Sequence, residues 1–167
     1  GELVIELDPG MAFGTGTHPT THLCLDWLCD RIAGGESVLD YGCGSGILGL
    51  AAARLRAARV LGVDIDPHAL AAAADNAQRN GVSLDLRSSG EPLAECFDLV
   101  VANILTNPLC VLAPLLSGRI AAGGHMALSG VLESQAEQVI TAYAPYVPLQ
   151  VGAVREGWVR LEGGRPC

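Results

Sequence analysis

A glycine-rich turn between a short apolar strand and a helix is the feature that most limits how this chain can fold. Residues 38–41 predict a strand, residues 42–46 read GCGSG, and residues 46–56 predict a helix. Glycines at such a turn let the backbone approach a ligand closely, and the start of the helix supplies amide donors. Two classes of ligand use this geometry, namely dinucleotides and S-adenosylmethionine.

The spacing of the glycines separates these two classes. A literal GxGxxG string begins at Gly44, but the predicted strand ends near Tyr41, so a dinucleotide turn would have to begin at Gly42. Counted from Gly42, the third glycine position of that pattern is Ile47. The spacing that fits is Asp40 followed by glycines at alternate positions. An acid there would repel a pyrophosphate and attract the ammonium and sulfonium of S-adenosylmethionine. We therefore expect Asp40, Gly42 and Gly44 to bind that cofactor, the alternative being a tight turn without a ligand.

Strands and helices alternate along the rest of the chain. Strands are expected at 3–7, 60–63, 83–87, 97–102 and 124–129, helices at 19–32, 67–80, 108–122 and 133–143, and a final antiparallel pair within 147–161. Such alternation predicts an α/β fold with a mainly parallel sheet covered by helices on both faces. No internal repeat or low-complexity linker interrupts it, so residues 1–167 are expected to form one domain.

Two further strands are followed by polar side chains at their carboxyl ends, where open α/β sheets bind ligands. Asp64 lies about 20 residues beyond the glycines, the spacing of a carboxylate that accepts hydrogen bonds from ribose hydroxyls. A helix cap is the alternative, although Asp66 is better placed for that role.

Asn103 follows the strand 97–102. Its side-chain amide could bond the methyl donor, and its carbonyl could accept a hydrogen bond from an incoming amine, which makes it the candidate catalytic residue. Asn107 is a weaker candidate, and an Asn-Pro turn is the plain alternative.

The loop DPGMAFGTGT at residues 8–17 precedes the first predicted helix. Its glycines and threonines could close over a ligand. Thr17 or His18 could cap the helix, and Thr21 lies in the first turn. His18 could act as a base, but a capping or solvent-facing histidine is equally compatible with the sequence.

Charge and composition exclude several classes of protein. The net charge is −8, and all ten basic residues are arginines scattered along the chain. Because nucleic-acid-binding domains usually carry a basic stripe, no direct contact with RNA or DNA is expected. The acidic balance suits a small cationic ligand or a basic protein partner.

The cysteines and the apolar runs indicate the compartment. The six cysteines form no CxxC pair, so small buried thiols in a reducing compartment are expected rather than disulfides or metal ligands. The start shows no signal peptide. The longest apolar run, residues 120–132, is too short for the roughly 20 residues of a membrane span. A cytoplasmic protein without a membrane span is therefore expected; its oligomeric state is left open.

Four segments together resemble the bacterial ribosomal protein L-eleven methyltransferase (PrmA) family. They read DPGMAFGTGTHPTT, LDYGCGSGILGLAAARL, GVDIDPHAL and VVANILTNPL, and the string SGVLESQAE and the tail around Trp158 also fit. The resemblance implies a Rossmann-like class I methyltransferase fold, with a mostly parallel seven-stranded sheet and an antiparallel last strand. It implies transfer of methyl groups from S-adenosylmethionine to lysine side chains and the N-terminus of a basic ribosomal protein, leaving S-adenosylhomocysteine. The implied donor-binding residues are Thr21, Gly42, Asp64 and Asn103.

One departure from the family weakens the assignment of the substrate. Family members begin with a separate substrate-recognition domain, to which nothing in this sequence corresponds, so a fragment or a short form with another substrate is expected. Three other hypotheses stay open. They are a class I methyltransferase acting on another protein or a small molecule, a nicotinamide-dependent oxidoreductase, and a domain that binds the donor or partners without catalysis.

Overall fold

A mostly parallel seven-stranded sheet forms the centre of the protein, as the computed structural model of the chain shows for residues 18–167. The strand order is β3-β2-β1-β4-β5-β7-β6, and β7 is antiparallel to both of its neighbours. The strands are β1 Ser37–Tyr41, β2 Arg59–Asp64, β3 Asp85–Ser88, β4 Phe97–Asn103, β5 Ile120–Leu132, β6 Gln150–Arg155 and β7 Trp158–Gly164. The expected α/β fold with an antiparallel last strand is confirmed. The predicted strand at 3–7 and the loop at 8–17 lie outside the described residues.

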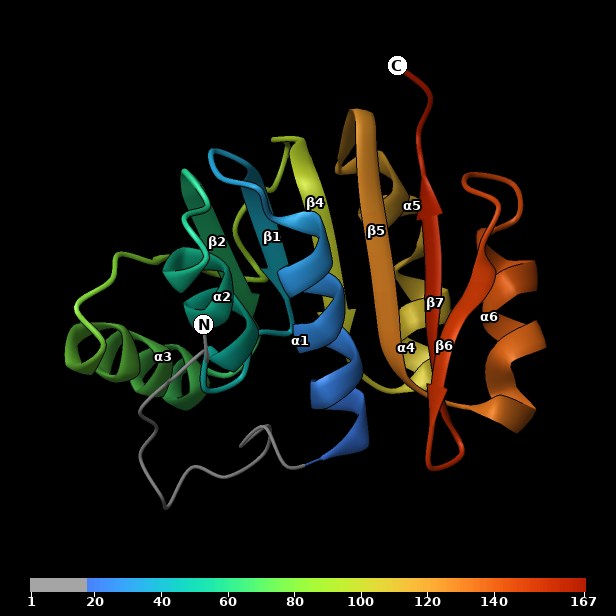
Figure 1. Ribbon diagram of the computed structural model, residues 1–167, viewed down its shortest axis with the longest axis horizontal. Helices are drawn as coiled ribbons and strands as arrows, with labels where there is room; N and C mark the ends of the chain where they lie inside the picture. The colour runs from blue at the N-terminus through green and yellow to red at the C-terminus, as the bar shows by residue number, and fades with distance from the viewer. Residues whose placement is uncertain (1–17) are drawn as a thin grey trace.

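Helices cover both faces of the sheet (Figure 1). One face carries α1 Pro19–Arg31, α2 Ile47–Arg54 and α3 Pro67–Arg79, and the other carries α4 Thr106–Val111, α5 Ala113–Gly118 and α6 Ala136–Tyr143. A 3-10 turn, η1 Glu133–Gln135, precedes α6. Within the described residues, no helix has both the length and the apolar character needed to cross a bilayer.

Alternating strand residues fill two cores, one against each layer of helices. In β1, Val38 packs with α1 and α2, whereas Leu39 packs into the core beneath α4–α6. In β4, Leu99 and Val100 divide in the same way. Because successive side chains of a strand point to opposite faces, a strand buried on both faces is apolar throughout. This explains why the central strands read as continuous apolar runs.

The helix predicted at 108–122 is wrong in its extent. The chain forms two short helices that meet at Leu112, and β5 already begins at Ile120. Pro114 stands in the first turn of α5 and has no amide hydrogen for the carbonyl four residues earlier, which ends α4. Ile120 is fully buried and pairs with Phe97 of β4, so the sheet takes the residues that helix periodicity assigned to a helix.

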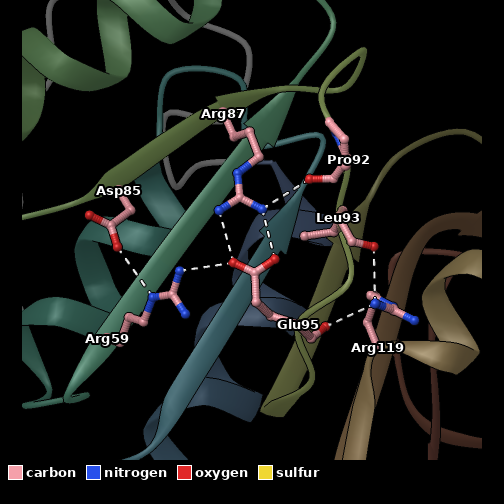
Figure 2. A network of polar contacts seen from close by, with 7 residues as sticks. All are labelled: Arg59, Asp85, Arg87, Pro92, Leu93, Glu95 and Arg119. Carbon is pink, nitrogen blue, oxygen red and sulfur yellow. Dashed lines mark hydrogen bonds and ion pairs between the residues drawn. The ribbon is translucent and has the colours of Figure 1, made fainter.

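An ion-pair network ties the loop between β3 and β4 to the sheet (Figure 2). The Arg87 guanidinium holds the Glu95 carboxylate through two contacts of 2.8 Å, and Arg59 bridges Glu95 and Asp85 at 3.2 Å each. Arg119 donates to the backbone carbonyls of Leu93 and Glu95. Hydrogen bonds from Arg87 and Arg59 favour the charged form of Glu95. They hold the pKa of this carboxyl well below its usual range. The network fixes a loop that has no secondary structure of its own.

Candidate functional site

A cavity of about 700 Å³ opens at the carboxyl ends of β1, β2 and β4. Its lining includes five of the six predicted cofactor residues, namely Asp40, Gly42, Gly44, Asp64 and Asn103. Apolar side chains complete the wall, among them Ile47, Leu48, Ile65, Ile104, Leu105, Leu112 and Trp158. The volume is within the range of about 300–1,000 Å³ that small-molecule sites occupy. The topology thus brings together residues that lie far apart in the sequence.

The glycine turn has the backbone that the spacing of its glycines predicted. Gly42, Gly44 and Gly46 have φ values of 77°, 54° and 89°, a region that residues with a Cβ rarely adopt. A Cβ at Gly42 would also collide with the side chain of Ile104 from the neighbouring strand end. Glycine at position 42 therefore keeps the turn close to the segment after β4.

The amides of this turn are already engaged within the protein. The N–H groups of Gly42 and Cys43 both donate to the carbonyl of Val63, at 2.7 and 3.0 Å. The Gly44 amide donates to Asp64 Oδ2 at 2.8 Å, and Gly46 donates to the Cys43 carbonyl at 2.8 Å. A diphosphate needs such donors free, since it binds through backbone amides. These four amides are therefore not free for a diphosphate, and this part of the turn suits a cation better.

Asp64 ends β2 and joins three segments around the cavity. One carboxylate oxygen accepts from the Gly44 amide, and the other accepts from the Asp66 amide at 3.0 Å. Asp66 is the cap of α3, because its side chain accepts from the His68 amide at 2.9 Å. The predicted cap role of Asp66 is confirmed, and the role of Asp64 toward a ribose stays a prediction. Each oxygen of Asp64 retains a lone pair for a hydroxyl group in the cavity.

Asp40 lies deeper than Asp64, at the floor of the cavity. It is 2% exposed and accepts a hydrogen bond of 3.0 Å from the Gly49 amide of α2. Burial disfavours its charged form, and the nearby Asp64 adds to the effect, so the pKa of Asp40 rises to about 7. The thiol of Cys43 is buried beside both acids, and its pKa is raised by burial first and by Asp40 and Asp64 next. A neutral thiol and two carboxyl groups therefore form a floor that favours a bound cation.

Asn103 is the last residue of β4 and lines the cavity, as predicted. Within residues 18–167 its side-chain amide makes no hydrogen bond to another protein group, so it is available to a ligand. Asn107 has a different role, because its Oδ1 accepts from Gln138 Nε2 of α6 at 3.3 Å. Asn107 is not among the residues that line the cavity.

The start of α1 contributes to the cavity through residues other than the one predicted. Thr21 is 1% exposed within α1 and is not part of the cavity lining, whereas His18 and Thr20 are. His18 caps the helix, because its Nδ1 accepts a hydrogen bond of 3.2 Å from the Thr20 amide. Its ring packs edge-on against Trp158, with 5.2 Å between the ring centroids. These contacts support the capping role that the sequence left open.

Three residues of the cavity wall escaped the sequence analysis. Ile65 follows Asp64, lines the cavity and is 82% exposed. Gly130 lies in β5 with φ of 90°, close to Ile104. Trp158 reaches the cavity from β7, a pairing that only the sheet topology provides. Its place directly after Asp64, at the carboxyl end of a predicted strand, would have been the available signal for Ile65.

The cysteines divide differently from the expectation of buried thiols. Cys24 and Cys43 are buried, Cys110 is half-buried, and Cys29, Cys96 and Cys167 are exposed. All six are free thiols in the structure. Burial was inferred from apolar neighbours in the sequence, but exposed turns and helix faces also carry such neighbours.

Known proteins resemble this chain over nearly its whole length. A sequence model described as "Ribosomal protein L11 methyltransferase (PrmA)" matches residues 1–166. A ribosomal protein L11 methyltransferase from Cupriavidus pinatubonensis is 56% identical over 164 residues, which is 98% of this chain and 55% of that protein. The chain thus spans about half the length of the curated relatives it matches.

Solved structures give the same result for the fold. A ribosomal protein L11 methylase from Lactobacillus delbrueckii subsp. bulgaricus superposes with a TM-score of 0.86 at 34% identity, covering 98% of this chain and 86% of that one. An RNA methyltransferase from Salinibacter ruber, solved in complex with S-adenosyl-L-homocysteine, shares the fold with a TM-score of 0.69 at 21% identity, covering 89% and 94%. The family match and the two levels of structural similarity lead to one conclusion: this chain belongs to the ribosomal protein L11 methyltransferase (PrmA) family.

Proposed function

We propose that this chain is the S-adenosylmethionine-dependent catalytic domain of a protein N-methyltransferase. The observation that carries the proposal is the anionic floor of the cavity. Asp40 and Asp64 face it from adjacent strands, while the amides of Gly42, Cys43 and Gly44 are engaged within the protein. Such a floor favours a cationic nucleoside over a diphosphate.

The residues present fit S-adenosylmethionine. Asp64 would accept hydrogen bonds from ribose hydroxyls, and Asp40 would favour the positive groups of the donor. The exposed Ile65 offers an apolar surface to a flat base. The backbone at Gly44 is open enough for close approach, since a Cβ there would meet no atom within 4 Å. Bound S-adenosylmethionine supplies a methyl group on a positively charged sulfur.

The chain's own residues would orient the amine that accepts the methyl group. The side-chain and backbone oxygens of Asn103 would accept hydrogen bonds from that amine. Leu105, Pro108 and Leu112 give the cavity an apolar entrance. A lysine has a solution pKa of about 10.4, and desolvation at an apolar entrance lowers it, which favours the neutral nucleophile. Alignment of the reacting groups can contribute roughly 7–11 kcal/mol to such a reaction.

The substrate we propose is ribosomal protein L11, the protein in the names of the relatives, modified on amino groups of lysines and the N-terminus. The acidic chain, with a net charge of −8, would attract a basic ribosomal protein. We place this reaction in the cytoplasm and propose no direct binding of nucleic acid. This chain spans about half the length of those relatives, and we propose that the other half supplies substrate recognition.

Two measurements test the proposal. In a thermal-shift assay, S-adenosylmethionine and S-adenosylhomocysteine should stabilise the chain. NAD should not, because it would place a diphosphate against the acidic floor of the cavity. Labelled methyl transfer to purified L11, measured for this chain and for the full-length protein, then separates an enzyme from a binding domain. Stabilisation by NAD alone would overturn the proposal. Transfer to a small molecule but not to L11 would retain the cofactor and reject the substrate.

A further inference from the structure

The segment between β4 and α4 forms one wall of the cavity and has little support of its own. Asn103, Ile104 and Leu105 all line the cavity. The helix that follows is only six residues long, and its N-cap, Leu105, provides no side-chain hydrogen bond. A single short helix without a cap fixes its first turn weakly. The position of Asn103–Leu105 must therefore depend on other elements.

Gln135 connects this segment to the end of β5. Its Oε1 accepts a hydrogen bond of 2.8 Å from Thr106 Oγ1 and another of 3.1 Å from the Leu132 amide. A backbone N–H can only donate, so the atom between them must be the oxygen of the side-chain amide, and the Thr106 hydroxyl must donate to it. One acceptor thus joins the first residue of α4 to the last residue of β5.

The end of β5 also contacts the segment from its other side. The Ile104 amide donates to the Ser129 carbonyl at 3.1 Å. Gly130 follows with φ of 90°, and a Cβ there would collide with the Ile104 carbonyl oxygen and lie 2.8 Å from the carbonyl carbon. Glycine at this position lets the segment after β4 lie directly against β5.

We infer that Gln135 is a positioning residue for methyl transfer, holding Asn103–Leu105 against β5 through Thr106 so that the acceptor amine meets the donor correctly. This inference rests on the proposed function. Donor binding would depend on Asp64 and the glycine turn, which belong to β2 and to the loop after β1 and make no contact with Gln135 among the described residues. Loss of Gln135 should therefore slow methyl transfer without lowering the affinity for the donor.

The first experiment removes and restores the acceptor. Gln135→Leu and Thr106→Val each break the hydrogen bond, whereas Gln135→Glu retains an acceptor for both donors and Thr106→Ser retains the hydroxyl. With saturating S-adenosylmethionine and L11, single-turnover transfer by Gln135→Leu and Thr106→Val should fall about tenfold or more, and the two conservative variants should stay within about threefold of the unsubstituted chain. The dissociation constant of S-adenosylhomocysteine should stay within about twofold in all four.

Matched controls separate positioning from a general loss of structure. Gln138→Leu removes another hydrogen bond between α6 and α4, at Asn107 and away from the cavity, and should leave the transfer rate close to normal. Gly130→Ala should slow transfer as Gln135→Leu does, whereas Gly118→Ala adds a methyl group in open space and should not. Equal losses in Gln135→Leu and Gln138→Leu would overturn the inference.

The second experiment needs no activity. The Leu132 amide bonds Gln135, so its hydrogen exchange should accelerate in Gln135→Leu and stay protected in Gln135→Glu, as measured by NMR or mass spectrometry. Unchanged exchange at Leu132, or a donor affinity that falls in parallel with the rate, would overturn the inference. If the unsubstituted chain neither binds the donor nor methylates L11, the proposed function fails, while exchange at Leu132 still decides whether Gln135 holds the segment.

Discussion

Asp40 and Asp64 line the same cavity from neighbouring strands, but their surroundings give them different chemistry. Asp64 is half-buried at the end of β2 and accepts two backbone hydrogen bonds. Asp40 is 2% exposed and, among residues 18–167, accepts a hydrogen bond only from the Gly49 amide. Burial and the neighbouring Asp64 raise the pKa of Asp40 to about 7, so its charge depends on pH near neutrality. The two acids can therefore be tested separately.

Asp40→Asn should stabilise the protein increasingly as pH rises. The folded-state pKa of about 7 lies above the ordinary value of 3.8, so the folded protein retains a proton that the unfolded chain loses between these values. Stability therefore falls across that window, and asparagine abolishes the dependence. The free energy of unfolding of Asp40→Asn relative to the unsubstituted chain should rise by roughly 2–3 kcal/mol between about pH 5 and pH 8, as urea titrations would measure. A difference independent of pH would contradict the assignment.

Asp64→Ala should weaken binding of S-adenosylmethionine at least tenfold, or by about 1.4 kcal/mol, in calorimetric titrations. The change removes the acceptor for the ribose and also releases the Gly44 amide. Asp66→Ala is the matched control, because Asp66 caps α3 through the His68 amide. It should lower stability by about 1 kcal/mol and leave donor affinity unchanged. An unchanged affinity in Asp64→Ala would refute the placement of the donor.

Among the elements, the loop between β3 and β4 shows how side chains replace regular structure. Ser89 begins this loop at the cavity, where its amide donates to the Asp64 carbonyl, and Glu95 ends it within the ion-pair network. The fork between Arg87 and Glu95 has the bidentate geometry of the stronger ion pairs (Figure 2). The network therefore restrains a loop whose other end faces the proposed ligand.

Glu95→Gln should lower the melting temperature. The glutamine side chain is uncharged and has a single acceptor oxygen, so it cannot replace the contacts of both Glu95 oxygens with Arg87 and Arg59. The loss should shrink in about 1 M salt, where the Debye length of roughly 3 Å screens the original pairs. Glu91→Gln, at an exposed position of the same loop, is the control for the change of charge alone. A loss of equal size in both variants, or one insensitive to salt, would show that the network contributes little.

For the molecule as a whole, the acidic balance is the property that bears on partners. A net charge of −8 creates a field that accelerates encounters with a cationic protein and is screened by salt. This chain spans about half the length of the curated relatives it matches. The charge of this half would then contribute to capturing the basic substrate that we propose.

The Michaelis constant for L11 should rise with ionic strength, at least severalfold between about 0.05 and 0.3 M salt, because long-range attraction is screened. The affinity for S-adenosylhomocysteine, a small ligand in a cavity, should change far less over the same range. Steady-state kinetics and calorimetry at matched salt concentrations would measure both. A Michaelis constant independent of salt would leave no role for the acidic surface.

The local sequence by itself determined the central strands, the glycine turn and the acids beside it. Gly42, Asp40 and Asp64 were predictable because a strand end, a turn and a helix start are encoded by neighbouring residues. Tertiary structure decided the contributions of Gly130 and Trp158, which line the cavity from β5 and β7, and of Gln135, which bonds Thr106 after the cavity wall. It also gave Ile120 to β5, because burial against Phe97 outweighs helical periodicity. The physical reason is the same throughout: local conformation depends on nearby residues, whereas neighbours in the sheet depend on the whole order of strands.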